Sequence, residues 1–196
     1  MRNYSMLSLA AAGLLFAQTA SAANYEIDPS HASAQFSVRH LMLSNVKGEF
    51  TKLKGTVVYD PENIAASSVE ATIDTTSVNT RESKRDKHLM GPDFFDTDKF
   101  PAMTFKSTKV EKGPAGKLAV TGNLTIHGIT KEIVLDVDGP TDEVKDPWGN
   151  MRRGASATVK LNRQDYGLKW NKLLETGGVV VGDDVAVTLD LEMIRK

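Results

Sequence analysis

The 196-residue chain contains no cysteine, which excludes disulfide bonds, thiolate metal sites and thiol nucleophiles. It also has no excess of charge, because 24 Lys and Arg side chains stand against 25 Asp and Glu, for a net charge of −1 at pH 7. A chain this close to neutral has no overall field that would draw nucleic acid or an anionic membrane surface to it. We therefore expect no nucleic-acid partner and no stable membrane insertion.

Long apolar runs are missing too, with one exception at the start of the chain. Residues 6–17 are largely apolar, follow Arg2 and precede the small residues Ala20, Ser21 and Ala22. A run of this length is typical of a secretory signal and is shorter than the roughly 20 residues needed to cross a bilayer. We predict a signal peptide over 1–22, cleaved after Ala22, and a protein that acts outside the cytoplasm. A membrane anchor is the alternative.

Residues 23–196 are expected to form one domain. Their number allows a sizeable core without disulfides, and they contain no low-complexity segment and no visible repeat. Removing 1–22 takes away Arg2 and no acidic residue, so the net charge becomes about −2.

Alternating apolar and polar residues indicate antiparallel strands with one covered face. The clearest case is 185–193, where every second residue is apolar: Val185, Val187, Leu189, Leu191 and Met193. The same period of two recurs at 34–38, 57–59, 69–73, 118–126 and 133–137. Turn-forming stretches separate the strands at 60–63, 112–114, 127–128, 138–140, 146–149 and 182–184.

A helix is expected in one place, over 80–90, because no Gly, Pro or β-branched residue follows Thr80 before Gly91 and Pro92 end the segment. A long antiparallel sheet with one helix usually closes, since closure removes its unpaired edges. A barrel of about eight strands also has room for one small ligand. We predict an all-β fold, a single antiparallel barrel with one short helix near 80–90. A two-sheet sandwich is the competing architecture.

Short blocks of sequence then point to a family. They run in order along residues 23–196: Asp28-Pro29-Ser30-His31, Phe36-Ser37-Val38-Arg39-His40, Gly48-Glu49-Phe50, Arg85-Asp86-Lys87-His88-Leu89, Asp93-Phe94-Phe95-Asp96, Phe100-Pro101, Phe105-Lys106-Ser107-Thr108, Gly122-Asn123-Leu124-Thr125-Ile126-His127-Gly128-Ile129-Thr130-Lys131, Arg163-Gln164-Asp165-Tyr166-Gly167 and Val181-Gly182-Asp183-Asp184-Val185. Together these blocks resemble the YceI-like family. The resemblance implies an elongated, lipocalin-like barrel in the bacterial periplasm. It also implies a pore that holds the tail of a polyisoprenoid such as a polyprenyl phosphate or an isoprenoid quinone.

The resemblance guides the choice of ligand-binding residues. An isoprenoid tail is hydrocarbon, so an enclosed apolar channel would hold it without any reaction centre. Large apolar side chains in or near the family-like blocks are the candidates for the channel wall: Phe36, Phe50, Leu89, Met90, Phe94, Phe95, Met103, Phe105 and Trp170. The alternative is that they fill a packed core, because a filled and a hollow barrel show the same alternation.

The head group of a lipid needs a polar site. Three sets of basic residues are candidates: Arg81, Arg85 and His88 in the expected helix, Arg39 and His40 at the end of a strand, and, more weakly, Arg152 and Arg153. The helix residues are spaced i, i+4 and i+7 and would share one face. A solvated charged helix face and a structural ion pair of Arg39 are the alternatives.

Neither a metal site nor a catalytic centre is predicted. The four histidines, His31, His40, His88 and His127, show no metal-ligand spacing, and an unbulged strand would send His31 and His40 to opposite faces. The acidic residues over 93–98 lack calcium-loop spacing and are interpreted as a turn before a strand at Ala102. No nucleophile elbow or glycine-rich phosphate motif occurs. The alternative is a dispersed catalytic triad formed by Ser37, His40 and Asp86.

Three classes of function therefore remain. Our prediction is periplasmic binding, transport or storage of an isoprenoid or other long amphiphilic lipid, with no cofactor apart from that ligand. The second class is a hydrolase-like enzyme acting on an amphiphile, and the third is a stress or adhesion protein acting through its outer surface. We leave open whether the chain forms a homodimer, since the sequence shows no segment that is diagnostic of a dimer interface.

Overall fold

Strands make up most of the chain. The computed structural model describes residues 22–175 and 177–196, so the predicted signal peptide, apart from Ala22, lies outside the described residues. The strands are β1 (Ala23–His40), β2 (Ser44–Phe50), β3 (Leu53–Tyr59), β4 (Ser68–Asp74), β5 (Val78–Asn79), β6 (Ala102–Lys112), β7 (Leu118–Ile126), β8 (Ile129–Asp138), β9 (Val144–Lys145), β10 (Met151–Asn162) and β11 (Val181–Arg195). Within the described ranges there is one α-helix, α1 (Ser83–Met90), and four short 3-10 helices, η1 (Ile64–Ala66), η2 (Thr75–Ser77), η3 (Pro114–Gly116) and η4 (Arg163–Tyr166).

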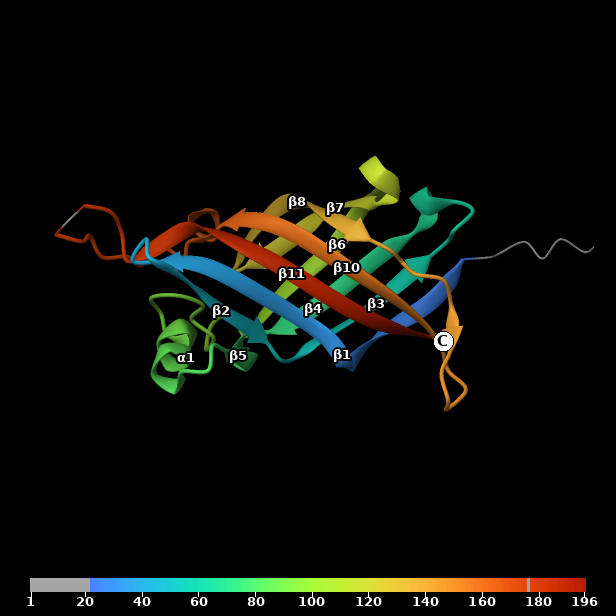
Figure 1. Cartoon of the computed structure of the whole chain (residues 1–196), viewed down its shortest axis with the longest axis horizontal. Helices are drawn as coiled ribbons and strands as arrows, with labels where there is room; N and C mark the ends of the chain where they lie inside the picture. The colour runs from blue at the N-terminus through green and yellow to red at the C-terminus, as the bar shows by residue number, and fades with distance from the viewer. Residues whose placement is uncertain (1–21, 176) are drawn as a thin grey trace, which may run out of the picture.

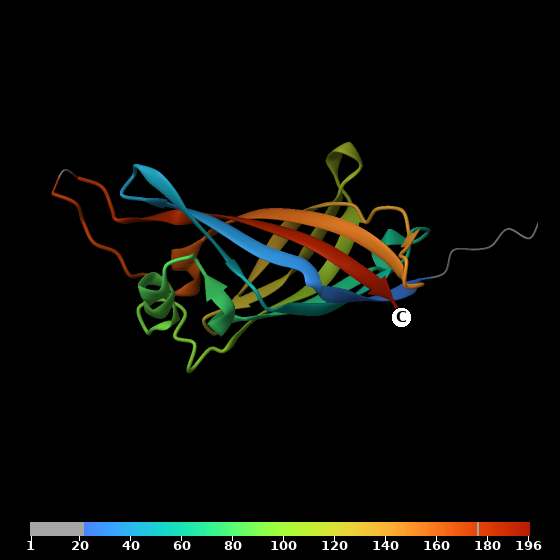
Figure 2. The same cartoon turned by 60° about the horizontal axis from the view of Figure 1, so that its bottom comes forward.

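Eight antiparallel strands close into one barrel, in the order β1-β3-β4-β6-β7-β8-β10-β11, and β11 returns to pair with β1. The start of β1 pairs with β3, and its second half pairs with β2, which in turn carries β5. Figures 1 and 2 show long, tilted strands around a single interior. The predicted barrel is confirmed, and the sandwich alternative is wrong.

The connections between strands lie at the two ends of the barrel. One end carries the β1–β2 turn, α1 and the segment between η4 and β11 (Figure 1). The other end carries the β3–β4 and β6–β7 connections, β9 and the C-terminus. We call these the α1 end and the β9 end.

The helix begins later than predicted, at Ser83 instead of Thr80. Arg81 has a φ of 63°, in the left-handed region, which a helix cannot continue through. The Glu82 side chain then accepts a hydrogen bond from the Lys84 backbone N–H and caps the first turn. Thr80 donates through its backbone N–H and its hydroxyl to Asp86, which fixes this entry to the helix.

Two strands on the barrel path had weak or interrupted signals. β10 presents the small residues Ala155 and Ala157 before Val159 and Leu161, so its alternation is faint. β6 contains a register shift between Ser107 and Lys109, which moves the inward position from Phe105 to Val110 and breaks the period of two.

An ion network ties strands together at the β9 end. Arg152 Nη1 donates to Asp28 Oδ2 at 2.7 Å, and Arg152 Nε donates to Asp146 at 2.7 Å. His31 Nδ1 lies 2.9 Å from the same oxygen of Asp28. The hydrogen bond from Arg152, followed by that with His31, holds the pKa of Asp28 well below its usual range.

This lowered pKa predicts an acid-sensitive contribution to folding. A carboxylate whose folded-state pKa is depressed adds stability that is fully present above its unfolded pKa, about 4, and is lost as pH falls below it. We expect Asp28→Asn to lower the free energy of unfolding at pH 7 and to flatten its decline below about pH 4. Urea titrations at a series of pH values measure this. An unchanged pH profile in the variant would assign the acid dependence to other carboxylates.

Candidate functional site

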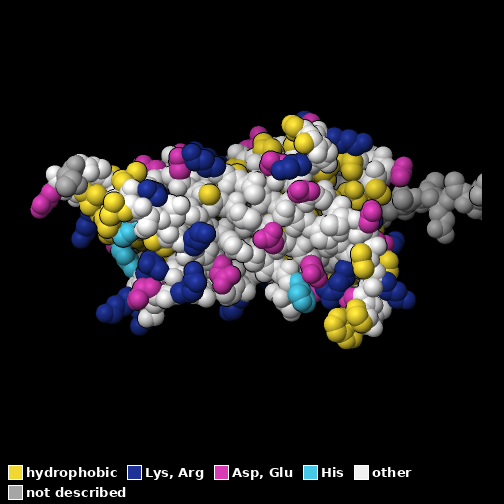
Figure 3. All heavy atoms as spheres, viewed as in Figure 1, with side chains coloured by type: hydrophobic (Ala, Val, Ile, Leu, Met, Phe, Trp, Pro, Cys, Tyr) yellow, Lys and Arg dark blue, Asp and Glu magenta, His cyan; other side chains and the backbone are white. Residues whose placement is uncertain are grey.

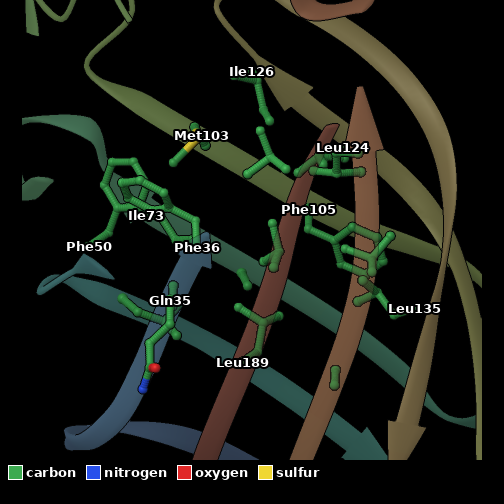
Figure 4. Close-up of a pocket in the computed structure, with 18 of the residues that line it drawn as sticks. Gln35, Phe36, Phe50, Ile73, Met103, Phe105, Leu124, Ile126, Leu135 and Leu189 are labelled. Carbon is green, nitrogen blue, oxygen red and sulfur yellow. The ribbon is translucent and has the colours of Figure 1, made fainter. Parts of the chain in front are cut away.

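A cavity of about 410 Å³ lies inside the barrel. Its wall is formed almost entirely by apolar side chains from the eight barrel strands, with further residues from α1 and from the segment after β10. The close-up in Figure 4 shows Phe36, Phe105, Leu135 and Leu189 around this space. The volume is in the range of cavities that enclose small-molecule ligands.

The exposure pattern of β11 reflects this hollow interior. Val185, Val187 and Leu189 point inward and line the cavity, yet they are only half-buried. Inward residues of a fully packed stretch would be buried, as Val120 of β7 and Leu135 of β8 are. The interior is therefore packed in part and open in part.

Nearly all the predicted wall residues lie around the cavity. The lining includes Phe36, Phe50, Leu89, Phe94, Phe95, Met103, Phe105 and Trp170. Met90 does not line it and packs against the core cluster that contains Ile27 and Tyr166. Whether these residues bind a ligand stays a prediction.

Aromatic rings concentrate toward the α1 end. The ring of His88 meets those of Phe94 and Trp170 edge-on, each at a centroid distance of 5.0 Å. Deeper in the barrel, Phe50 lies 5.7 Å from Phe36 and contacts Phe95 edge-on at 5.4 Å. These ring contacts hold the aromatic side chains of the cavity wall in place.

The predicted head-group residues separate into two kinds. Arg39, His40, Arg85 and His88 all line the cavity. Arg81 does not, because it precedes α1, so the predicted helical stripe with Arg85 and His88 is wrong. Arg85 donates to the backbone carbonyl and hydroxyl of Thr80, both at 2.8 Å, and is therefore held in place.

Two of the remaining basic residues of the cavity have local partners. His88 Nε2 lies 3.0 Å from Asp93, and Arg39 donates to the Met42 carbonyl at 2.8 Å. The weaker candidates Arg152 and Arg153 lie at the β9 end. Arg152 belongs to the ion network, and Arg153 donates to the Tyr25 hydroxyl at 2.8 Å.

The β9 end of the barrel is filled. Tyr25, Val57 and Met193 form a buried cluster there. The Tyr25 hydroxyl donates to Glu143 at 2.9 Å and accepts from Arg153, so these side chains connect two strands, β1 and β10, and the loop before β9 across this end. The arginine and histidine side chains of the cavity thus gather at the α1 end, opposite a filled end.

Comparison with known proteins identifies the family. The YceI-like domain matches residues 25–193, almost all of the described chain. The chain belongs to the YceI-like family. This confirms the resemblance seen in the sequence blocks.

Relatives of this YceI-like chain include proteins known from sequence and from structure. A UPF0312 protein of Vibrio cholerae is 45% identical over 152 residues, which cover 76% of this chain and 80% of that protein. The crystal structure of the Campylobacter jejuni YCEI protein aligns with a TM-score of 0.67 and 34% identity, covering 80% of this chain and 89% of that one. A polyisoprenoid binding domain from Saccharophagus degradans shares the fold, with a TM-score of 0.64, 18% identity and coverage of 88% and 98%.

Sequence reasoning missed Arg163, a buried and multiply hydrogen-bonded residue of this YceI-like barrel. Its side chain lines the cavity, is 5% exposed and donates to the carbonyls of Leu168, Trp170 and Gly182. Burial lowers its pKa, and the ion pair with Asp183 opposes that change. A signal existed, because Arg163 opens one of the family-like blocks.

A second missed wall residue is Tyr166, in the same 3-10 helix. Its side chain is 2% exposed, and burial raises the pKa of its hydroxyl. Within the described residues that hydroxyl has no hydrogen-bond partner. Tyr166 lies beside Leu168 in the core, so the turn after β10 forms part of the cavity wall.

The residues of the dispersed triad are not brought into one arrangement at the cavity. His40 lines it, whereas Ser37 does not, and the Asp86 carboxylate is bonded to Thr80. Asp28, His31 and Glu192 place three potential metal-ligand atoms within 4.8 Å of one another. Arg152 already donates to both of those carboxylates, so each of them has a partner within the protein.

Proposed function

We propose that this chain binds a long amphiphilic lipid, a polyisoprenoid with a polar terminus, inside the barrel. The observation that carries the proposal is the hollow, largely apolar interior whose arginine and histidine side chains all lie at the α1 end. Family membership and the fold shared with a polyisoprenoid binding domain of Saccharophagus degradans support it.

Physical chemistry favours binding over catalysis in such a cavity. Removal of hydrocarbon from water contributes about 0.8 kcal/mol for each buried CH₂ group, so an apolar tunnel retains a prenyl tail without specific polar contacts. A catalytic centre would need an aligned nucleophile and base, whereas the Asp86 carboxylate is already bonded to Thr80. We therefore infer a binding protein, not an enzyme.

The two ends of the cavity differ in character. The buried cluster of Tyr25, Val57 and Met193 fills the β9 end, so the tail of the lipid would point toward it. The head group would lie at the α1 end, beside Arg39, His40 and His88. Positive charge there would favour a phosphate or a polar quinone ring.

The setting we propose is the periplasm, where the chain would carry or store its lipid. The predicted signal peptide and the family support this location. Among residues 22–175 and 177–196, no helix combines the length and apolar character needed to span a bilayer.

Native mass spectrometry of the protein, expressed in bacteria and purified without detergent, tests the function. We expect one added mass per chain, and organic extraction should release a compound whose fragments repeat in isoprene units. The polar terminus of that compound tests the placement of the head group, because a phosphate or quinone fits the basic residues at the α1 end. A ligand-free mass that stays unchanged after incubation with polyprenyl phosphate and with an isoprenoid quinone would reject the proposal.

A further inference from the structure

Large apolar side chains are exposed at both ends of the barrel. At the α1 end, Met42 and Leu43 of the β1–β2 turn are 52% and 79% exposed, and Leu173 is 86% exposed. At the β9 end, Val144 and Trp148 are 63% and 81% exposed. Figure 3 shows hydrophobic side chains gathered at the α1 end and a separate group on the loop near the C-terminus. Exposed apolar groups of this size mark surfaces that bind another protein or a membrane.

The three exposed residues at the α1 end belong to one surface. The Leu41 backbone N–H donates to the Val180 carbonyl at 2.8 Å, which ties the β1–β2 turn to the segment that leads into β11. A Cβ placed on Gly178 would lie 3.6 Å from the side chain of Met42, so the two loops are in contact. Both loops project along the barrel axis beyond the strands (Figures 1 and 2). We call Met42, Leu43 and Leu173 the apolar tip.

Charge distinguishes the apolar tip from the exposed residues at the β9 end. Arg39 and Lys47 flank the β1–β2 turn, and Lys169 and Lys172 precede Leu173, whereas the acidic residue nearest to this tip in sequence is Glu175. None of the three lysines has an ion-pair partner among the described residues. The segment that carries Val144 and Trp148 has Asp138, Asp142, Glu143 and Asp146 against Lys145 instead, and Glu143 and Asp146 pair with Arg195 and Arg152.

Exposed apolar residues framed by unpaired lysines are suited to a membrane interface that contains anionic lipids. The apolar side chains enter the headgroup region, and each nearby cation adds attraction to the negative surface. The near-zero net charge of the whole chain does not exclude such a local excess of positive charge. The apolar tip also lies at the end where the arginine and histidine side chains of the cavity gather.

We propose that the apolar tip docks this barrel reversibly on an anionic bilayer surface, with the α1 end of the cavity turned toward the lipid. This goes beyond the proposed cargo, and docking does not depend on which amphiphile the barrel holds. Docking in this orientation would bring the cavity mouth to a membrane without inserting the barrel.

Vesicle flotation of the protein tests the docking. The probe is a vesicle of phosphatidylethanolamine and phosphatidylglycerol without any isoprenoid, compared with a vesicle of phosphatidylcholine alone. We expect binding to the anionic vesicle that weakens at high salt. Combining Met42→Asn, Leu43→Ser and Leu173→Ser should lower the partition coefficient about tenfold or more. Asn is chosen at position 42 because the backbone φ there is 59°, which Asn tolerates.

The matched control is Val144→Ser with Trp148→Ser, which removes exposed apolar area from the β9 end. This control should bind vesicles as the wild type does, and both variants should keep the wild-type melting temperature and any co-purified lipid. Three results would overturn the docking proposal: no binding by the wild type, equal loss in the control, or an apolar tip that holds two copies together in solution while vesicle binding is absent. If docking fails while the tip variant still retains its co-purified lipid, the docking proposal is rejected and the proposed lipid binding is not.

Discussion

Replacing Leu189 by tryptophan is expected to lower the affinity for a polyprenyl lipid about a hundredfold. Leu189 lies in the middle of β11, points into the cavity and is half-buried because open space lies beside it (Figure 4). An indole there would occupy the path of the tail. Excluding about four CH₂ groups from the cavity costs roughly 3 kcal/mol, which corresponds to that loss. Titration with a fluorescent polyprenyl phosphate, alongside native mass spectrometry, measures the effect.

Thr188→Trp is the matched control for this change. Thr188 is the preceding residue of the same strand and faces outward, so the same side chain is added without entering the cavity. We expect this variant to bind lipid as the wild type does. Leu189→Trp should keep a cooperative unfolding transition, because the added volume enters empty space and does not overfill a packed core. Equal binding by the two variants would place the ligand outside the barrel.

Replacing Arg163 by alanine is expected to give a loss of about 4 kcal/mol in the free energy of unfolding. The guanidinium is buried and donates to the carbonyls of Leu168, Trp170 and Gly182 and to Asp183. Alanine would leave several buried acceptors unsatisfied and would release the turn that carries part of the cavity wall. Urea denaturation measures the stability. Intrinsic tryptophan fluorescence, in part from Trp170, reports on the loosened turn.

Two variants separate this effect from a general loss of charge. Lys160→Ala removes an exposed cation that forms an ion pair with Asp184 at 2.6 Å, and should change stability by less than about 0.5 kcal/mol. Arg163→Lys should recover only part of the lost stability, because a single ammonium cannot reach carbonyls that lie in several directions. A fully stable Arg163→Ala protein would show that the turn is held by its apolar contacts alone.

The elements that were predicted well have signals that are local in sequence. Alternation located β1, β3, β4, β7, β8 and β11, because the side-chain period of a strand is a property of the backbone. Alternation did not locate β10 or β6, although the turn over 93–98 predicted the start of β6 at Ala102. The inward residues of β10 include small alanines, and the bulge in β6 reverses which residues face inward after Ser107.

The same difference between local signals and features that depend on the fold applies to the candidate site. Large apolar residues in the family-like blocks line the cavity, with Met90 as the exception. The proposed helical face failed because the left-handed backbone at Arg81 delays the helix, and composition carries no signal of that conformation. Arg163 was missed because a buried arginine requires acceptors that only the folded turn and β11 bring to it.

By itself the sequence determined the class of fold, the family and the apolar face of most strands, since these follow from short-range periodicity and from blocks of residues in order. The tertiary structure alone decided that the barrel is hollow and that the arginine and histidine side chains of its cavity gather at one end. The physical reason is distance along the chain. A cavity exists only where inward side chains from strands far apart in sequence fail to meet across the barrel, and each strand alternates in the same way whether they meet or not.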